Sequence, residues 1–184
     1  MIRFYLLLML TLLLASCASV PEKDEVAFDL RGRESLYELS EWTFQGRVSV
    51  TDESNAVSGS IEWSHRVGED HIKLSGPFGQ GRTRIVIFDR HVEIDSAGEK
   101  INYFGGVDKV VSSRLGVELP VSSLKYWVLG LTSPLLSYKA FAGGFVQDGW
   151  RVSYLSMQAQ NMPRKIRVEK GKAKLKLIIN QWEM

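Results

Sequence analysis

The side chains best suited to catalysis or metal binding are scattered along this sequence. The three histidines, His65, His71 and His91, fall in or near separate strand-like segments and lack the spacing of a metal-binding motif. No Gly-x-Ser-x-Gly elbow occurs, and the acidic residues are spread over loops and polar strand faces, so no acid–base pair stands out. Gly79 and Gly81 precede a strand-like segment rather than a helix, which argues against a phosphate-binding loop. We therefore predict that the chain is not an enzyme and binds no metal.

Cys17 is the residue whose surroundings do predict a chemical modification. Arg3, an apolar run at 5–14 and the small residues 15–16 follow the order of a secretory signal, and the run is shorter than the ~20 residues of a membrane-spanning helix. The segment 14–17 (Leu-Ala-Ser-Cys) resembles the bacterial lipobox, in which the cysteine carries S-diacylglycerol and an N-acyl chain after cleavage. As the only cysteine of the chain, Cys17 has no disulfide partner within it. We predict lipidation of Cys17 and no other cofactor; the alternative is an ordinary secretion signal with an incidental cysteine.

Length and charge indicate one domain behind a tether. Residues 1–16 form the predicted signal peptide, which is cleaved. Residues 17–32 carry the lipidated cysteine and then a polar, charged stretch that is typical of a flexible tether. Residues 33–184 suffice for a single domain with a hydrophobic core. The chain has 23 basic and 21 acidic residues, a balance that argues against an electrostatic nucleic-acid binder.

Apolar residues alternate with polar ones over much of the chain, which indicates half-buried β-strands. In the segment 42–50 every second residue is apolar or glycine. Asp148-Gly149 and Gly171 predict tight hairpin turns, and Gly143-Gly144 predicts another turn. Further strand-like runs occur at 57–63, 72–74, 83–87, 91–94, 100–103, 145–147, 150–155, 165–168 and 173–179.

Three segments have helical rather than strand periodicity. They are 33–39, 108–116 with an aspartate cap and a glycine stop, and 120–130. So many short strands in one sheet would curl, and short apolar helices need a surface on which to bury their faces. We predict a mainly β fold: an incomplete antiparallel β-barrel, or curled sheet, with helices covering or filling its concave apolar side.

Inward-facing side chains follow from the same periodicities. The sequence leaves open whether they fill a core or line a cavity for acyl chains, because both require apolar side chains that point inward. The same alternatives hold for the five tryptophans, at 42, 63, 127, 150 and 182. The candidates for an acyl-chain cavity are Val48, Val50, Ile61, Trp63, Leu74, Ile85, Ile87, Leu124, Trp127 and Val128.

Phe78 lies in a predicted loop between Gly76-Pro77 and Gly79. Loops run over the surface, so this phenylalanine is either tucked back or exposed. An exposed large apolar side chain at a loop tip is typical of contact with a membrane or an apolar partner.

Several motifs, in order along the chain, resemble the LolB family of outer-membrane lipoprotein receptors. They are Cys17 in its lipobox and the segments 74–79, 119–131, 147–154, 162–163 and 175–182. The resemblance covers almost the whole chain after the signal. It implies an incomplete antiparallel β-barrel with an apolar interior, as in LolA and LolB, in agreement with the periodicity.

The resemblance also implies a function and a location. A member of this family is a monomer, lipid-anchored in the outer membrane, with its domain facing the periplasm. It accepts lipoproteins by their acyl chains from the soluble carrier LolA and inserts them into the inner leaflet of the outer membrane, without nucleotide hydrolysis. Pro77, Phe78 and Gly79 correspond to the membrane-transfer loop, where the family commonly has leucine at the position of Phe78. Ala18 and Ser19 replace the aspartate that retains lipoproteins in the inner membrane.

Three other functions are compatible with parts of the sequence. The chain could bind other lipids or lipopolysaccharide, or serve as a scaffold lipoprotein with a filled core. A surface hydrolase is the least supported, because no nucleophile–base set is visible. For the surface that docks the carrier, the candidate is a basic run, with a solvated strand face as the alternative. This run comprises Lys165, Arg167, Lys170, Lys172, Lys174 and Lys176.

Overall fold

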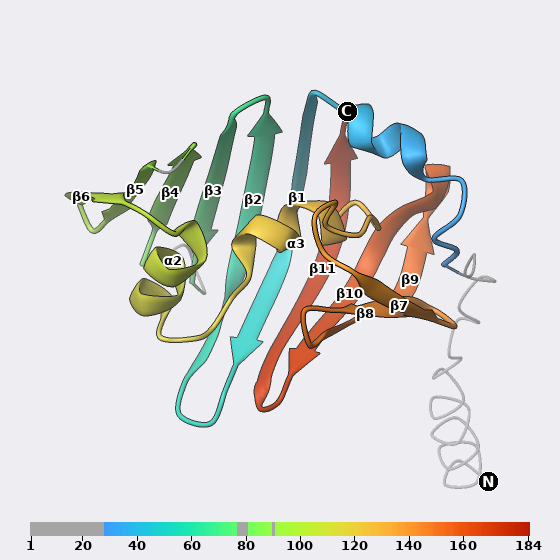
Figure 1. Cartoon of the computed structure of the whole chain (residues 1–184). Helices are drawn as coiled ribbons and strands as arrows, with labels where there is room; N and C mark the ends of the chain where they lie inside the picture. Colours follow the sequence, from blue (N-terminus) through green and yellow to red (C-terminus); the bar gives the residue numbers. More distant parts are fainter. Residues whose placement is uncertain (1–27, 77–80, 90) are drawn as a thin grey trace, which may run out of the picture.

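The computed structural model describes residues 28–76, 81–89 and 91–184. These residues form one antiparallel sheet of eleven strands, with two α-helices against one of its faces (Figure 1). The strand order is β6-β5-β4-β3-β2-β1-β11-β10-β9-β8-β7, so the first and last strands pair at the centre of the sheet. Among the described residues β6 and β7 are edges that do not pair with each other, so the barrel is incomplete, as predicted.

The helical elements are η2 (Glu34–Glu38), α2 (Val107–Leu115), α3 (Val121–Trp127) and η4 (Ala159–Asn161). The strands are β1 (Glu41–Thr51), β2 (Ala56–Arg66), β3 (Glu69–Ser75), β4 (Thr83–Phe88), β5 (His91–Ser96), β6 (Glu99–Phe104), β7 (Tyr138–Phe141), β8 (Gly144–Gln147), β9 (Trp150–Gln158), β10 (Met162–Lys170) and β11 (Ala173–Glu183).

The predicted hairpin turns are confirmed. Asp148 and Gly149 join β8 to β9 with φ angles of 50° and 76°, the backbone conformation that a two-residue hairpin loop requires. Gly171, with φ 58°, lies in the turn between β10 and β11. Gly143, with φ 85°, lies in the turn between β7 and β8.

Two strand glycines allow close approach of neighbouring backbones. The register between β1 and β11 shifts at Gly46, where a β-bulge inserts an extra residue into β11. A Cβ atom on Gly46 would collide with the carbonyl oxygen of Ile178. A Cβ atom on Gly59 would likewise collide with the carbonyl oxygen of Ser75.

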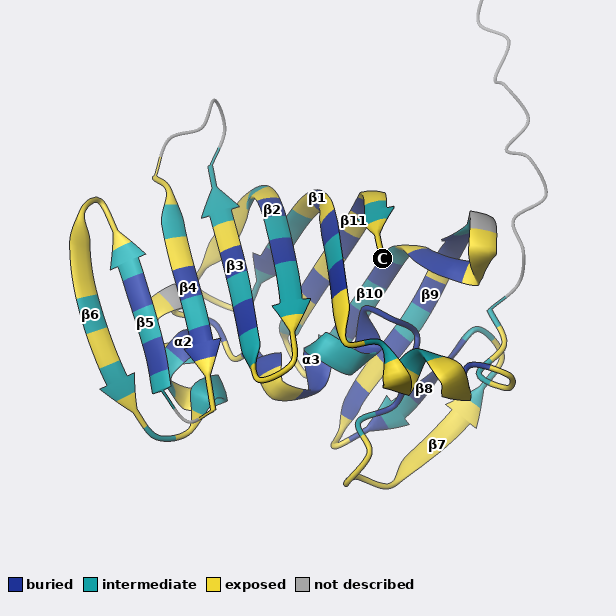
Figure 2. Ribbon diagram, turned by 90° about the horizontal axis from the view of Figure 1, so that it is seen from above, coloured by how far each residue is buried: buried dark blue, intermediate teal, exposed yellow. Residues whose placement is uncertain are grey.

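Burial alternates along the strands, and the buried side chains face the helices. Figure 2 shows the alternating bands on β1, β3 and β4, and places α2 and α3 within the curve of the sheet. Residues on this concave face form a hydrophobic core that also includes both helices. The convex face is mostly polar. The fold class predicted from periodicity is therefore confirmed.

Three local predictions were wrong in detail. The predicted helix at 33–39 is a 3₁₀ segment, Glu34–Glu38, none of whose residues is buried. Asp108 does not cap its own helix, which has Gly106 at its N-cap. Its Oδ1 instead accepts hydrogen bonds from the backbone N–H and the hydroxyl of Ser122, 2.8 and 3.0 Å away, at the start of α3. Strand β7 was not predicted.

Contacts with the domain begin before residue 33. The ring of Phe28 stacks on Tyr154 with centroids 3.9 Å apart, and Leu30 packs against the core. Residues 28–32, at the end of the predicted tether, therefore lie against the sheet. No helix within the described ranges is long and apolar enough to span a membrane.

Candidate functional site

An apolar cavity of about 220 Å³ lies between the concave face of the sheet and the helices. Its walls come from β1 to β4, from β11, and from α2, α3 and the residues that join them. Most of the lining side chains are aliphatic. They are Val48, Val50, Val57, Ser58, Gly59, Ser60, Ile61, Trp63, Ile72, Leu74, Ser75, Gly76, Gly81, Thr83, Ile85, Val111, Val117, Leu119, Val121, Leu124, Leu175 and Leu177.

Strand register brings these residues together from distant parts of the chain. Val50 pairs with Val57 on β2 and with Leu175 on β11, so three apolar side chains form one cross-strand row. Val48 lies in the next row, opposite Gly59 and Leu177. The backbone at Ser75 and Gly76 comes close to Gly59 in this row and forms part of the cavity wall. The cavity therefore depends on the pairing of the first and last strands.

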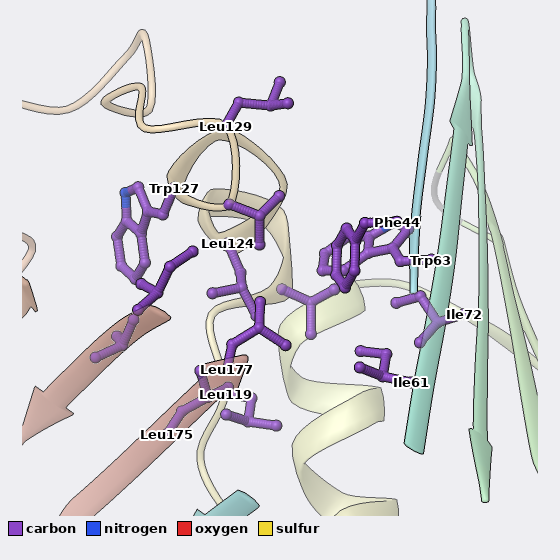
Figure 3. Packing of buried hydrophobic residues seen from close by; sticks show 14 of the residues in the cluster. Phe44, Ile61, Trp63, Ile72, Leu119, Leu124, Trp127, Leu129, Leu175 and Leu177 are labelled. Atoms are coloured by element: carbon purple, nitrogen blue, oxygen red, sulfur yellow. The ribbon is translucent and has the colours of Figure 1, made fainter. Parts of the chain in front are cut away.

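The helices close this space from the other side. Val111 of α2 and Leu124 of α3 point towards the sheet, and Leu119 lies in the link between the helices. Figure 3 shows Leu124 and Leu177 between α3 and the strands, with Trp63 on the side of β2 and Trp127 on the far side of the helix.

Trp63 is held in place by a polar contact at the rim of the apolar wall. Its indole Nε1 donates a hydrogen bond of 2.9 Å to Oδ1 of Asp70, which is itself buried. The same carboxylate oxygen lies 2.9 Å from Nδ1 of His65. Because the carboxylate of Asp70 accepts this bond, the indole of Trp63 can be buried without an unsatisfied N–H.

The cavity opens at one end of the sheet. Val57 is 40% exposed although it lines the wall, and Val48 and Leu74 are half-buried. Gly76 and Gly81 line the same end and flank residues 77–80. The predicted transfer-loop residues Pro77, Phe78 and Gly79 lie outside the described residues, as does Cys17.

Seven of the ten predicted cavity residues line the wall: Val48, Val50, Ile61, Trp63, Leu74, Ile85 and Leu124. The other three, Ile87, Trp127 and Val128, are buried in the solid core outside the cavity wall. The sequence analysis missed Val57, Ile72, Val111, Val117, Leu119, Val121, Leu175 and Leu177. Alternation in β11 indicated that Leu175 and Leu177 share a face. No local sequence pattern, however, indicated that β11 pairs with β1.

Buried hydrogen bonds hold the C-terminal end of α3. Nε1 of Trp127 donates to Oε1 of Gln147 at 2.9 Å, and the hydroxyl of Tyr154 donates to the carbonyl oxygen of Trp127 at 2.8 Å. Burial raises the pKa of Tyr154 well above its ordinary value, so this hydroxyl stays protonated and available as a donor. Arg33 adds a bond of 2.6 Å from Nη2 to the carbonyl oxygen of Leu129.

The polar contacts that join α2 to β6 and to the β1–β2 turn are exposed instead. Nε of Arg114 donates to the hydroxyl of Tyr103 on β6 at 2.7 Å, and Nδ2 of Asn55 donates to the carbonyl oxygen of Gly116 at 2.9 Å. Exposed polar contacts stabilise less than buried ones, because water competes for the same groups. Of the two helices over the cavity, α2 thus has the more exposed polar contacts with the sheet, while its Val111 is buried in the core.

An open, curled sheet whose helices cover an apolar concave cavity defines the fold class of the protein, which solved structures share. A crystal structure of a LolA superfamily protein from Nitrosomonas europaea matches it with a TM-score of 0.50 and 6% sequence identity. The match covers 79% of this chain and 86% of that one.

The family follows from sequence. The model of the family "Outer membrane lipoprotein LolB" matches residues 40–182, and the chain belongs to this family. It is 32% identical over 176 residues to the outer-membrane lipoprotein LolB of Thiobacillus denitrificans, covering 92% of this chain and 91% of that protein. It is 30% identical over 196 residues to that of Nitrosococcus oceani, covering 99% and 98%. The predicted family and the outer-membrane location are thereby confirmed, and the family is one of lipoproteins rather than enzymes.

Proposed function

We propose that this protein receives lipoproteins from the periplasmic carrier LolA by taking their acyl chains into the apolar cavity, and then passes them to the outer membrane. The observation that carries the proposal is the cavity itself, which is apolar, open at one end and covered by a helix whose polar contacts with the sheet are exposed. The lipid on Cys17 anchors the domain on the periplasmic side of the membrane.

The transfer needs no nucleotide if each successive site binds the acyl chains more favourably. Exposure of one CH₂ group to water costs about 0.8 kcal/mol, so the chains must stay covered throughout. A difference of about 1.4 kcal/mol between two sites biases the exchange tenfold. The carrier, this cavity and the bilayer would then form a series of increasing affinity.

Acceptance of acyl chains requires the cavity to enlarge. Its volume of about 220 Å³ is only moderately above that of an engineered cavity of ~150 Å³ that holds one benzene molecule, and below the ~300 Å³ at which pockets for drug-sized ligands begin. Displacement of α2 would enlarge it; the exposed contacts of Arg114 and Asn55 break at little cost, and the acyl chains would replace the apolar contacts of Val111. The buried contacts at Trp127 would keep α3 attached meanwhile.

The proposal is tested by mixing a labelled lipoprotein bound to LolA with this protein in the absence of ATP. We expect the label to co-purify with this protein. A label that stays on the carrier would contradict the receptor role. Mass spectrometry of lipids bound to the purified protein then separates the alternatives, since lipopolysaccharide or free phospholipid as the only ligand would indicate a different lipid-binding function.

Phe78→Glu should separate acceptance from release. An apolar side chain at the tip of the transfer loop is proposed to enter the bilayer, and a carboxylate there would oppose entry. We expect normal acceptance from LolA and at least a tenfold slower appearance of the lipoprotein in acceptor vesicles. Phe78→Leu, which restores the family's common residue, is the control and should release normally. Equal release by Phe78→Glu and Phe78→Leu would rule out the loop's role.

A further inference from the structure

The convex face of the sheet carries a cluster of basic side chains behind the open end of the cavity. Strand register places Lys174 between Thr51 and Glu169, and Lys176 between Ser49 and Arg167. Their neighbours on the opposite, concave face are the cavity residues Leu175 and Leu177. We call the cluster the basic face: Arg47, Arg151, Lys165, Arg167, Lys174 and Lys176.

Basic side chains outnumber acidic ones on this face. In the three rows that run through Lys174, Lys176 and Ile178 from β1 to β9, Glu169 is the one carboxylate among the described residues. On the other half of the convex face opposite charges alternate and meet, as in Lys73 with Glu62 at 2.6 Å and Lys100 with Glu93 at 3.6 Å. Because the whole chain is nearly neutral, the cluster is a local feature and does not follow from an overall positive charge.

The composition of the basic face favours a lipid headgroup over a protein partner. Protein interfaces have an apolar core enriched in aromatic residues and depleted of lysine. On the basic face, lysine and arginine occupy half of the positions in the three cross-strand rows. Ile178, which lies between Arg47 and Lys165, is a large apolar side chain and is 42% exposed. Clusters of basic residues on flexible stems bind anionic membrane surfaces, without a need for shape complementarity.

The position of the basic face also fits a membrane. The turns of β1–β2 and β10–β11 lie at the same end of the sheet, at the bottom of Figure 1. Lys174 and Lys176 lie near the start of β11, which begins at this end of the sheet. The cavity opens at the same end, near Val57 and Gly76. An anionic surface held at the basic face would therefore lie beside the mouth of the cavity.

We propose that the basic face binds the anionic phospholipid headgroups of the membrane in which this lipoprotein is anchored, and so turns the mouth of the cavity towards the bilayer. The covalent anchor keeps the domain near the surface at high effective concentration, so that even weak headgroup contacts orient it. This inference goes beyond lipoprotein transfer, because headgroup binding needs neither a carrier nor a cargo.

The test uses the polypeptide from Ala18 to Met184, which contains every described element and the whole core but no lipid. Flotation with vesicles of phosphatidylethanolamine and phosphatidylglycerol should show binding, and vesicles of phosphatidylcholine should show little. At about 1 M salt, where the Debye length is ~3 Å, the binding should disappear. Lys174→Glu with Lys176→Glu should lower the partition coefficient roughly tenfold or more, because basic residues near an anionic surface each add to the attraction.

A matched double variant changes the same amount of charge elsewhere on the convex face. Arg84→Glu with Lys100→Glu should leave binding within about twofold, since this half already pairs its charges. Lys174→Gln with Lys176→Gln, which introduces no new carboxylate beside Glu169, should give an intermediate loss if the fold is kept. Equal losses in the two Glu variants, or no loss in either, would overturn the proposal. The proposal would also be overturned if the protein did not bind vesicles and the variant with Lys174→Glu and Lys176→Glu took up lipoproteins from LolA poorly. That result would indicate that the basic face binds an acidic protein instead.

Discussion

Val57→Trp is expected to lower the rate at which this protein accepts lipoproteins from LolA by at least tenfold. Val57 lies at the open end of the cavity and is 40% exposed, so an indole there has room to project across the mouth. The added ring would compete with acyl chains for the same apolar space. Because the site is partly open, we expect the free energy of unfolding to change by less than about 1 kcal/mol.

Transfer of a labelled lipoprotein measures this effect directly. Val67→Trp is the matched control, because Val67 is 80% exposed in the turn between β2 and β3, at the opposite end of these strands. This control should accept lipoproteins normally. If Val57→Trp also accepted them at the normal rate while remaining folded, acyl chains would not enter by this end of the cavity.

Gln147→Leu should destabilise the domain by about 3 kcal/mol or more, although the new side chain has a similar size. Gln147 is 1% exposed, and its amide holds the chain beyond α3. Oε1 accepts from Nε1 of Trp127 at 2.9 Å and from the N–H of Ser133 at 2.7 Å. Nε2 donates to the carbonyl oxygens of Ser133 at 3.0 Å and Leu136 at 2.8 Å. Leucine would leave these four groups without partners in a site closed to water.

Thermal unfolding checks this prediction. For a domain of this size a loss of about 3 kcal/mol corresponds to a Tm lower by roughly 6–12 °C. Gln181→Leu is the control, because Gln181 is exposed on β11 and its amide donates to the exposed carboxylate of Glu183 at 3.0 Å. Its effect should stay within about 0.5 kcal/mol. Similar Tm values for the two variants would mean that the buried amide does not anchor α3.

Local patterns in the sequence suffice for most of the strands and for the concave apolar face. The alternation in β1 and β2 identifies Val50, Ile61 and Trp63 as inward-facing, because residues two apart share a face of a strand. Strand β7 gave no such signal, since Tyr138, Lys139 and Ala140 are all exposed at the edge of the sheet. Helical spacing placed Trp127 and Leu124 on one apolar surface, yet only Leu124 reaches the cavity.

The parts that were not predicted depend on contacts between distant residues. Leu175 and Leu177 line the cavity only because β11 pairs with β1, more than a hundred residues earlier in the chain. Asp108 has the sequence of a cap for α2 but bonds to Ser122 of α3, because the two helices pack side by side. The basic run was visible in the sequence, whereas its cross-strand neighbours Arg47 and Arg151 become apparent only from the register.

The most direct measurement is photolabelling from the acyl chain itself. A lipoprotein whose fatty acid carries a photoreactive group is transferred to this protein and irradiated, and the labelled peptides are then mapped. We expect labels on the concave face, at residues such as Val48, Ile61 and Leu124. Labels confined to exposed apolar residues outside the cavity, such as Phe88 and Phe104, would contradict the claim that the cavity holds the acyl chains.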